Sequence, residues 1–167
     1  MSEAHPLAIN IRPALAEDAD GIARTFLESA EYHTRMDPER YSVPALETIA
    51  TRYREGRQHL GTSEQAITLV AELHGEIVGF VDVRLDQSPD LMHRNVVYCH
   101  TEEIAVSDRH KSHGIGSLLL QAAEDWGRKM SAEFASLEFH VENKRAALFY
   151  QKRMGYHPVS ITAIKRL

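Results

Sequence analysis

The sequence has almost no cysteine: Cys99 is the only one among 167 residues. A single cysteine excludes an internal disulfide framework. No apolar run approaches the roughly 20 residues that a membrane-spanning helix requires. Residues 1–10 also lack the basic start and the apolar stretch of a signal peptide. These absences predict a cytoplasmic protein without a membrane partner.

An excess of basic residues is missing as well. The chain carries 19 Lys and Arg against 24 Asp and Glu, which gives a formal net charge of −5. Because binding to nucleic acid needs a basic surface that neutralises phosphates, this balance argues against nucleic acid as the main partner. The hydrophobic fraction of 43% and the charged fraction of 26% are ordinary for a soluble globular protein. The length predicts one domain, residues 1–167.

Hydrophobic periodicity predicts strands at 9–12, 66–73, 77–85, 96–106, 136–141 and 159–164. Helical spacing predicts helices that begin near Asp18, at 44–53, from Ile115 and at 144–154, whereas the proline-broken segment 32–44 is predicted to be a loop. The helix from Ile115 is expected to bury the face formed by Ile115, Leu118, Leu119, Ala122, Ala123, Trp126 and Met130. The resulting order, βααβββαβαβ, predicts an α+β or mixed α/β layout around one sheet.

The sharpest local signal lies between a predicted strand and a predicted helix, in the run Lys111-Ser112-His113-Gly114-Ile115-Gly116-Ser117. The first amides of a helix have no internal partner, and the helix dipole makes that end positive. Two glycines let the backbone approach a bulky anion, so the run is typical of a phosphate site, to which Arg109 and Lys111 add charge. A P-loop would need a lysine before the serine, and a dinucleotide fingerprint would need glycine at Leu119, so neither fits.

Two segments carry a resemblance to a known family. Residues 103–106 followed by 109–119 are similar to the strand, pyrophosphate loop and helix of the GNAT superfamily of acyl-CoA-dependent N-acetyltransferases. Residues 143–150 and the pair Gly155-Tyr156 resemble that family's Asn-x-x-Ala-x-x-x-Tyr segment and its closing Gly-aromatic pair. Lys111 stands where the family usually has Arg or Gln, and Ser112 replaces a frequent glycine. Tyr150 and Gly155 are five positions apart where about four are expected, which predicts an added residue near the end of this helix.

The resemblance implies a GNAT-like fold with one central, mixed and mostly antiparallel sheet flanked by helices. It also implies acetyl-CoA as co-substrate, an amine as acceptor and a possible homodimer, because many relatives pair as dimers. The residues implied in binding the cofactor are Ile104, Ala105, Val106, Lys111, His113, Gly114, Ile115, Gly116, Ser117 and Asn143. Among them, Val106 is expected to supply the amide for the oxyanion, and Asn143 is equally suited to cap the helix that follows it.

Catalysis of acyl transfer needs a group for the leaving thiolate and a base for the amine. Tyr150 lies seven positions after Asn143, on the same helix face, and its phenol can protonate a thiolate. Glu102 is the first candidate for the base, followed by Glu103 and His100. Strand alternation predicts that His100, Glu102 and Ile104 share one face and that Glu103 and Ala105 share the other.

The acceptor is expected to contact segment 32–41, where Tyr32, His33, Arg35 and Tyr41 combine aromatic faces with polar tips, and where Arg35 suits a substrate carboxylate. A small molecule, an antibiotic-like amine, a protein N-terminus and a lysine all stay open, and the acidic balance favours a cationic acceptor. His110 and His113 lack the further ligands of a metal site, so no metal is expected. Cys99 is expected to be a small buried residue, which favours direct transfer in a ternary complex. The competing hypothesis is a non-catalytic acyl-CoA-binding sensor or regulatory module.

Overall fold

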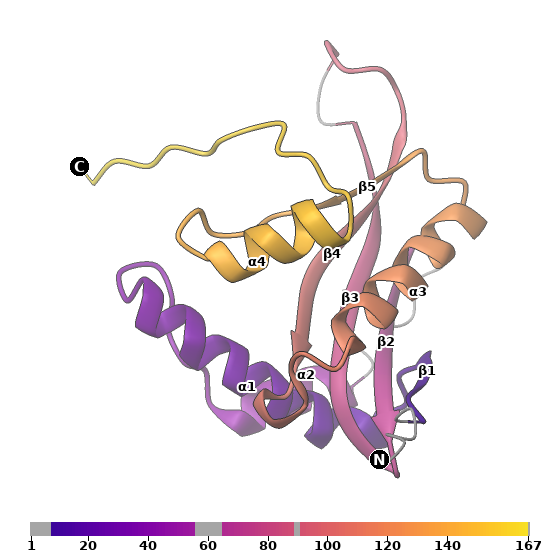
Figure 1. Ribbon diagram of the computed structural model, residues 1–167, viewed down its shortest axis with the longest axis vertical. Coiled ribbons are helices and arrows are strands. Elements are labelled where there is room, and N and C mark those ends of the chain that lie inside the picture. Colours follow the sequence, from indigo (N-terminus) through magenta and orange to yellow (C-terminus); the bar gives the residue numbers. More distant parts are fainter. Residues whose placement is uncertain (1–7, 56–64, 89–90, 167) are drawn as a thin grey trace, which may run out of the picture.

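The computed structural model describes residues 8–55, 65–88 and 91–166. Its strands and helices follow one another in the order β1 (Asn10–Pro13), α1 (Ala19–Met36), α2 (Leu46–Arg54), β2 (Ala66–Leu73), β3 (Glu76–Gln87), β4 (Val97–Val106), α3 (Ile115–Lys129), β5 (Phe134–Leu137) and α4 (Lys144–Leu148) (Figure 1). Short 3₁₀ turns at Ala16–Asp18 and Asp108–His110 precede α1 and α3, and a π-helical turn at Phe149–Arg153 follows α4. The predicted α+β class is confirmed.

One five-stranded sheet, in the order β1-β2-β3-β4-β5, forms the centre of the protein. The first three pairings are antiparallel, and β5 is parallel to β4. The turn between β2 and β3 places His74 at φ 52° and Gly75 at φ 83°. Positive φ at both central residues matches the twist of a two-residue hairpin, so the predicted hairpin is confirmed.

The pairing between β4 and β5 is short. It joins Tyr98–Thr101 to Phe134–Leu137 and goes no further along either strand. Figure 1 shows β5 beside the upper part of β4 only. Among the described residues, 102–106 of β4 therefore have a sheet neighbour on the β3 side and an open backbone edge on the other.

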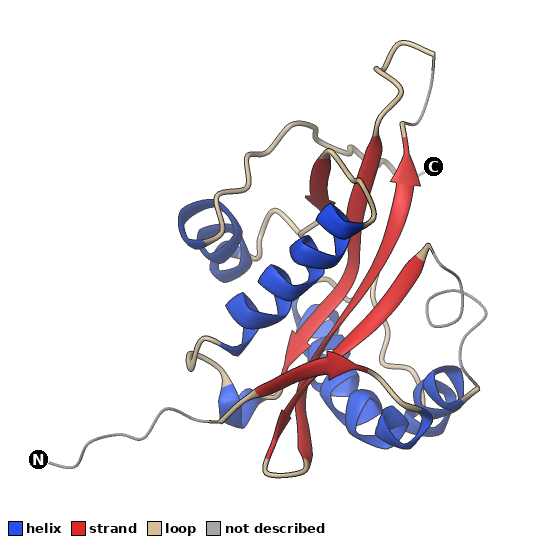
Figure 2. Cartoon of the chain, turned by 90° about the vertical axis from the view of Figure 1, so that its right-hand side faces the viewer, coloured by secondary structure: helices blue, strands red, loops and turns tan. Residues whose placement is uncertain are grey.

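Helices cover both faces of the sheet (Figure 2). One face packs against α3 through a core cluster that includes Leu69, Ala71, Val81, Val83, Ile115 and Leu119. The other face packs against α1 and α2 through Val70, Phe80 and Ala105. This division follows the two-residue alternation of the strands, which sends neighbouring side chains to opposite faces.

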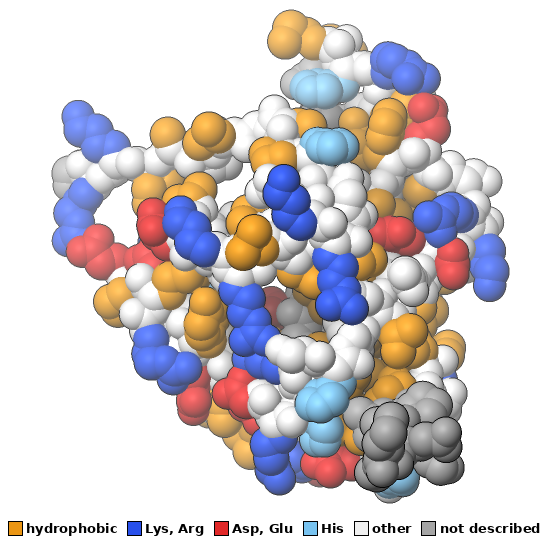
Figure 3. All heavy atoms as spheres, viewed as in Figure 1, with side chains coloured by type: hydrophobic (Ala, Val, Ile, Leu, Met, Phe, Trp, Pro, Cys, Tyr) orange, Lys and Arg blue, Asp and Glu red, His pale blue; other side chains and the backbone are white. Residues whose placement is uncertain are grey.

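The exposed surface carries both signs of charge. Lys and Arg side chains gather around α4 and the loop before α3 on the face seen in Figure 3. Among the helices of the described residues, none is both long enough and apolar enough to cross a membrane.

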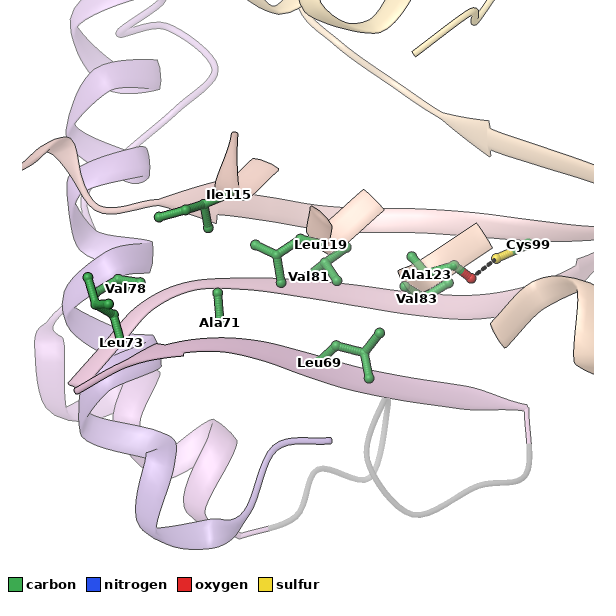
Figure 4. Packing of buried hydrophobic residues seen from close by; sticks show 10 residues of the cluster. All are labelled: Leu69, Ala71, Leu73, Val78, Val81, Val83, Cys99, Ile115, Leu119 and Ala123. Atoms are coloured by element: carbon green, nitrogen blue, oxygen red, sulfur yellow. Dashed lines mark hydrogen bonds between the residues drawn. The ribbon is translucent and has the colours of Figure 1, made fainter. Parts of the chain in front are cut away.

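Helix α3 fits tightly onto the sheet where Gly127 faces Cys99. The nearby thiol of Cys99 donates to the carbonyl of Ala123 at 3.4 Å (Figure 4). A Cβ at Gly127 would lie 2.5 Å from the Cβ of Cys99 and 2.6 Å from its sulfur. The absence of a side chain at this position thus sets how closely α3 approaches β4.

Gly127→Ala should destabilise the protein by about 1–3 kcal/mol, because overpacking outweighs the roughly 1 kcal/mol by which alanine favours a helix. The measurement is the free energy of unfolding in urea. Gly116→Ala is the matched control, since its Cβ would come no closer than 3.5 Å to any neighbour. A Gly127→Ala protein as stable as the wild type would contradict this account of the packing.

Three predictions about the elements are wrong. Helix α1 continues to Met36, so residues 32–36 are helical rather than part of a loop; the helix ends only before Pro38, where the proline disfavours helical backbone at Asp37. The β5 strand lies at Phe134–Leu137 instead of 136–141. Residues 159–164 form no strand in the described part of the chain; Val159 is 94% exposed and Ile161 is 88% exposed. An alternating segment becomes a strand only when a neighbouring backbone pairs with it.

The start of α3 at Ile115 is as predicted, but its buried face is rotated. Leu118 is 42% exposed, and Leu120 is fully buried in its place. Ile115, Leu119 and Ala123 of the predicted face do belong to the core cluster against the sheet.

Candidate active site

The loop before α3 presents backbone amides at the start of the helix. Ser112 and Gly114 both have left-handed backbone, with φ 68° and φ 83°, and so turn the chain sharply into Ile115. The amides of Ser117 and Leu118 bond to the carbonyl of Gly114 at 3.0 and 3.1 Å. The earlier amides precede the first position at which a helix supplies an acceptor, so they point out of the helix end.

Space in front of these amides suits a bulky anion. A Cβ at Gly114 would meet nothing within 4 Å among the described residues, and the nearest neighbours of one at Gly116 would be the Phe149 ring at 3.5 Å and the Val106 side chain at 3.9 Å. The hydroxyl of Ser117 is buried and has no hydrogen-bond partner within the part of the chain that the structure describes. An open cradle with a free hydroxyl and a positive helix end fits the pyrophosphate of coenzyme A.

The charged side chains of the loop are held by neighbours. Lys111 forms an ion pair with Asp108, and its ammonium lies 5.9 Å from the centre of the Tyr32 ring. Arg145 on α4 donates to the Ser112 hydroxyl at 3.4 Å. His113 is exposed, and its Nδ1 contacts the His110 carbonyl at 3.2 Å. The loop is therefore attached to both α1 and α4.

The open edge of β4 leads directly into this loop. The side chains of Ile104 and Val106 pack toward α3, and that of Ala105 packs toward α1 and α2. On the β3 side, the register pairs Ala105 with Phe80, and the amide of Ser107 bonds to the Val78 carbonyl at 2.9 Å. The other edge of the same residues offers backbone amides and carbonyls to a ligand.

A β-bulge in β4 separates the two glutamates. Asp82 pairs with Glu103 and Val83 pairs with Thr101, so Glu102 is the extra residue. The extra residue breaks the alternation assumed from the sequence. His100 pairs with Arg84, which shares its face with Asp82 and therefore with Glu103, and the predicted grouping of His100 with Ile104 is wrong.

The surroundings of the glutamates differ. Glu102 is exposed and forms an ion pair with Arg84. Glu103 lies against α1, where it accepts a hydrogen bond from the Ser29 hydroxyl at 3.4 Å. Burial and the neighbouring Asp82 carboxylate raise the pKa of Glu103 to about 7. The third base candidate, His100, contacts the Ser136 hydroxyl through Nδ1 at 3.0 Å.

Tyr150 lies in the π-helical turn after α4. Its ring is buried between Phe139, at 5.5 Å between centroids, and Tyr156, at 6.2 Å. Within the described residues its hydroxyl has no hydrogen-bond partner. Burial, and secondarily the charge of Glu103, raise the pKa of Tyr150 to about 12, so the phenol stays protonated and able to donate.

The π-helical turn explains the long spacing between Tyr150 and Gly155. The amide of Met154 bonds to the Phe149 carbonyl, five residues earlier, at 3.1 Å. A π turn accommodates one more residue than an α turn, in agreement with the added residue predicted from the sequence.

Asn143 caps α4, which is one of the two roles that the sequence predicts for it. Its side-chain oxygen accepts from the Ala146 amide at 3.0 Å and from the Tyr32 hydroxyl at 3.4 Å. The second contact links the start of α4 to the last turns of α1.

Three of the four residues expected to bind the acceptor, Tyr32, His33 and Tyr41, form part of an aromatic cluster between α1 and segment 138–142, whereas Arg35 is exposed. The His33 ring lies 5.3 Å from Tyr41, and Tyr41 lies 6.2 Å from His140. His140 also contacts Asp37 at 3.2 Å through Nε2. His140 carries no signal in the sequence, because its contacts come from residues about a hundred positions away.

Metal and thiol chemistry find no support in the described residues. No group of three or more His, Cys, Asp or Glu side chains there is arranged to hold a metal ion. Cys99 is buried, and that burial raises the pKa of its thiol to about 11. A thiol in this state is a poor nucleophile at neutral pH.

The raised pKa of Glu103 predicts a pH-dependent stability. Glutamate in an unfolded chain titrates near 4.3, so between about pH 4 and pH 7 the folded protein holds a proton that the unfolded chain has lost. The contribution of Glu103 to stability therefore falls as the pH rises through this window. Glu103→Gln should gain stability over the wild type, and urea unfolding should show that gain growing by about 2 kcal/mol between pH 5 and pH 8. Glu102→Gln is the control, because it makes the same change at the exposed neighbour on β4. An equal gain for Glu103→Gln at both pH values would contradict the prediction.

Comparison with known proteins places the chain among acetyltransferases. The model of a family described as the acetyltransferase (GNAT) family matches residues 25–156. An N-alpha-acetyltransferase from Sulfurisphaera tokodaii is 33% identical over 112 residues, which are 62% of this chain and 64% of that protein. An uncharacterized N-acetyltransferase from Methanocaldococcus jannaschii is 34% identical over 87 residues, which are 52% of this chain and 37% of that protein. The chain thus matches less than two thirds of the length of both relatives.

Solved structures share the fold at lower identity. The tetramutant of the BH1408 protein from Bacillus halodurans superposes with a TM-score of 0.83 at 21% identity, over 95% of this chain and 99% of that one. The aminoglycoside N-acetyltransferase AAC(6')-Iy in complex with CoA superposes with a TM-score of 0.71 at 14% identity, over 99% of both chains. The family match includes the open edge of β4, the loop before α3 and the turn that carries Tyr150, and the chain belongs to the GNAT family of acetyltransferases.

Proposed function

We propose that the protein is an acetyl-CoA-dependent N-acetyltransferase that acts on a primary amine by direct attack in a ternary complex. One observation carries the proposal: Glu103 and Tyr150 lie close enough for the charge of Glu103 to raise the pKa of Tyr150, beside an open strand edge that leads into an anion-binding helix start. This arrangement supplies the base, the donor and the cofactor cradle that the reaction requires.

The cofactor would bind along one continuous path. The amides from His113 to Ser117 would hold the pyrophosphate, as the open space at Gly114 and Gly116 allows. The free edge of β4 at Ile104, Ala105 and Val106 would pair with the pantetheine amides as a neighbouring strand does. Lys111 and Asn143 lie at the two sides of this path, where each is also held by a neighbour within the protein.

The chemistry then assigns one role to each group. Glu103 accepts a proton from the ammonium form of the acceptor, directly or through a water molecule. The free amine attacks the thioester carbonyl, and a backbone amide at the open edge, for which we propose Val106, stabilises the oxyanion. When the C–S bond breaks, Tyr150 donates its phenolic proton to the leaving sulfur, and the proton that the amide nitrogen loses restores the phenol directly or through water, so that amide and thiol are the products.

The charge of the site favours a cationic acceptor. Glu103 and the buried Asp82 are paired across β4 and β3, and Glu102 is the neighbour of Glu103 on β4. The acceptor would enter between α1 and segment 138–142, past Tyr32 and the aromatic cluster around Tyr41. Both small-molecule amines and peptide or protein amines meet these requirements.

Tyr150→Phe should lower kcat about 10–100-fold and leave the KM for acetyl-CoA within about twofold, because phenylalanine keeps the ring contacts and removes only the donor. Tyr156→Phe is the matched control: its hydroxyl bonds to Glu124 at 3.0 Å, away from the reacting groups, so it should lower stability and not kcat. An unchanged kcat for Tyr150→Phe across the pH range would remove Tyr150 from the mechanism.

The function itself is tested in two steps. Calorimetry with CoA and acetyl-CoA tests the cradle, and release of free CoA thiol with a panel of primary amines tests the transfer, with intact-mass detection of the acetylated product. We expect heat on binding and amine-dependent release. Binding without any amine-dependent release would favour the sensor, and no heat at millimolar cofactor would overturn both readings.

A further inference from the structure

A second carboxylate lies directly opposite Glu103. The register of β3 and β4 pairs Asp82 with Glu103, so both side chains occupy the face that packs against α1 and α2. The Asp82 side chain is 0% exposed and lies among the largest fully buried groups of the protein.

The partners of Asp82 are neutral. The Tyr53 hydroxyl donates to one carboxylate oxygen at 2.5 Å, and the Thr68 hydroxyl donates to the other at 2.6 Å. Within the described residues no cation forms an ion pair with Asp82; Arg84, two positions along β3, pairs with Glu102 and Asp86. Two hydroxyl donors satisfy the oxygens without cancelling the charge.

An uncompensated buried carboxylate beside a second carboxylate weakens the fold, so packing and stability do not explain it. A neutral amide side chain at position 82 would disturb the fold little, since Tyr53 and Thr68 could form hydrogen bonds with it as well. What the carboxylate does provide is a negative charge facing Glu103.

We propose that Asp82 is a positioning residue for the base Glu103: its buried carboxylate, held by Tyr53 and Thr68 directly opposite Glu103 in the sheet, sets a negative charge against the base and so strengthens its hold on the proton of the acceptor. The inference rests on the proposed function, in which Glu103 receives a proton from the acceptor amine. A base that exchanges its proton near the working pH is the most effective one.

Of the other groups around Glu103, some raise its pKa and some lower it. Glu102 on β4 adds a further negative charge, and the positive charge of Arg52 on α2 has the opposite effect on the pKa of Glu103. Ser29 on α1 donates to Glu103, which favours the ionised form. Tyr53 and Tyr150 face it as neutral phenols, because burial raises the pKa of both. Asp82 is the largest charged contribution to the raised pKa of Glu103.

The test is a titration of Glu103 in the substrate-free protein. Glutamate labelled with ¹³C at the side-chain carboxyl gives one NMR signal for each residue, and Glu103→Gln identifies the signal of Glu103. We expect a midpoint near pH 7 in the wild type, and a midpoint about one unit lower in Asp82→Asn. Asp86→Asn, the same change at a partly exposed position of β3, should leave the midpoint unmoved.

Thr68→Val covers the case in which Asp82→Asn does not fold. It preserves the side-chain shape and removes one donor, so Asp82 becomes easier to protonate and the Glu103 midpoint should move down as well, by less. An unmoved midpoint in folded Asp82→Asn, or in Thr68→Val where only that protein folds, overturns the proposal.

The same experiment separates this inference from the proposed function. The titration needs neither acetyl-CoA nor an amine, so a null shift leaves the acetyltransferase proposal intact. If the midpoint shifts but the protein never releases CoA, the proposed acetyltransferase activity is overturned, whereas the electrostatic coupling between Asp82 and Glu103 stands. Where transfer is observed, the pH at which kcat/KM falls on the acidic side should move down in Asp82→Asn together with the NMR midpoint.

Discussion

Replacing Glu103 with glutamine should lower kcat/KM for the acceptor amine about 10²- to 10⁴-fold at pH 8, the usual contribution of a general base. The amide has the same shape and can still accept from Ser29, so the change removes proton uptake and little else. Because the pKa of Glu103 is about 7, wild-type kcat/KM should fall as the pH drops below 7, and Glu103→Gln should lack this limb. The measurement is a pH profile of CoA release at saturating acetyl-CoA.

Glu102→Gln is the matched control for this prediction. Glu102 is the neighbour along the strand, but it is exposed and paired with Arg84, so its loss should change kcat/KM by less than about threefold, as expected for a surface ion pair. A large loss in Glu102→Gln with a small one in Glu103→Gln would reverse the assignment of the base. Equal small losses would leave both glutamates outside the chemistry.

The contrast between Glu102 and Glu103 shows which features of the site cannot be predicted from the sequence. The sequence places both residues on one strand, alternation puts them on opposite faces, and Glu102 is the first candidate for the base. The bulge that makes Glu102 the extra residue depends on the pairing of β3 with β4, which involves residues about twenty positions apart. The charge of Asp82 reaches Glu103 through the same pairing. Neither fact has a local signal.

The loop before α3 was predictable because its signal is local. A strand, two glycines and a helix start within a dozen residues are enough to predict an amide-lined anion site, and the helix begins at Ile115 as expected. The hairpin of β2 and β3 was predictable for the same reason. The end of α1 was not: residues 32–36 contain nothing that breaks a helix, and the prolines that suggested a loop lie beyond its end.

Segment 159–164 illustrates the opposite error. Its alternation is the pattern of a strand. Among the described residues, however, β5 pairs only with β4, and segment 159–164 pairs with neither of these strands. Periodicity describes which side chains could share a face. Strand formation also requires a backbone partner in register, which is a property of the whole sheet.

Gly116→Asp should weaken the binding of acetyl-CoA by about two to three orders of magnitude, the largest effect expected for any change in the cradle. The second residue of α3 has room for a side chain, since a Cβ there would meet its nearest neighbour at 3.5 Å. A carboxylate in that space would lie beside the pyrophosphate, and two like charges about 4 Å apart repel by about 4 kcal/mol at the effective dielectric of a protein surface. Isothermal calorimetry with CoA measures the loss directly.

Misfolding does not account for such a loss, because aspartate in the first turn of a helix is favourable. The negative charge complements the positive end of the dipole, and aspartate is a better helix former than glycine, so ligand-free Gly116→Asp should melt at or above the wild-type temperature. Gly116→Asn has the same size without the charge, and its smaller loss of affinity should isolate the steric share. Unaltered affinity in a folded Gly116→Asp protein would show that the phosphates bind elsewhere. The thioester would then also lie away from Glu103 and Tyr150, the groups proposed to act on it.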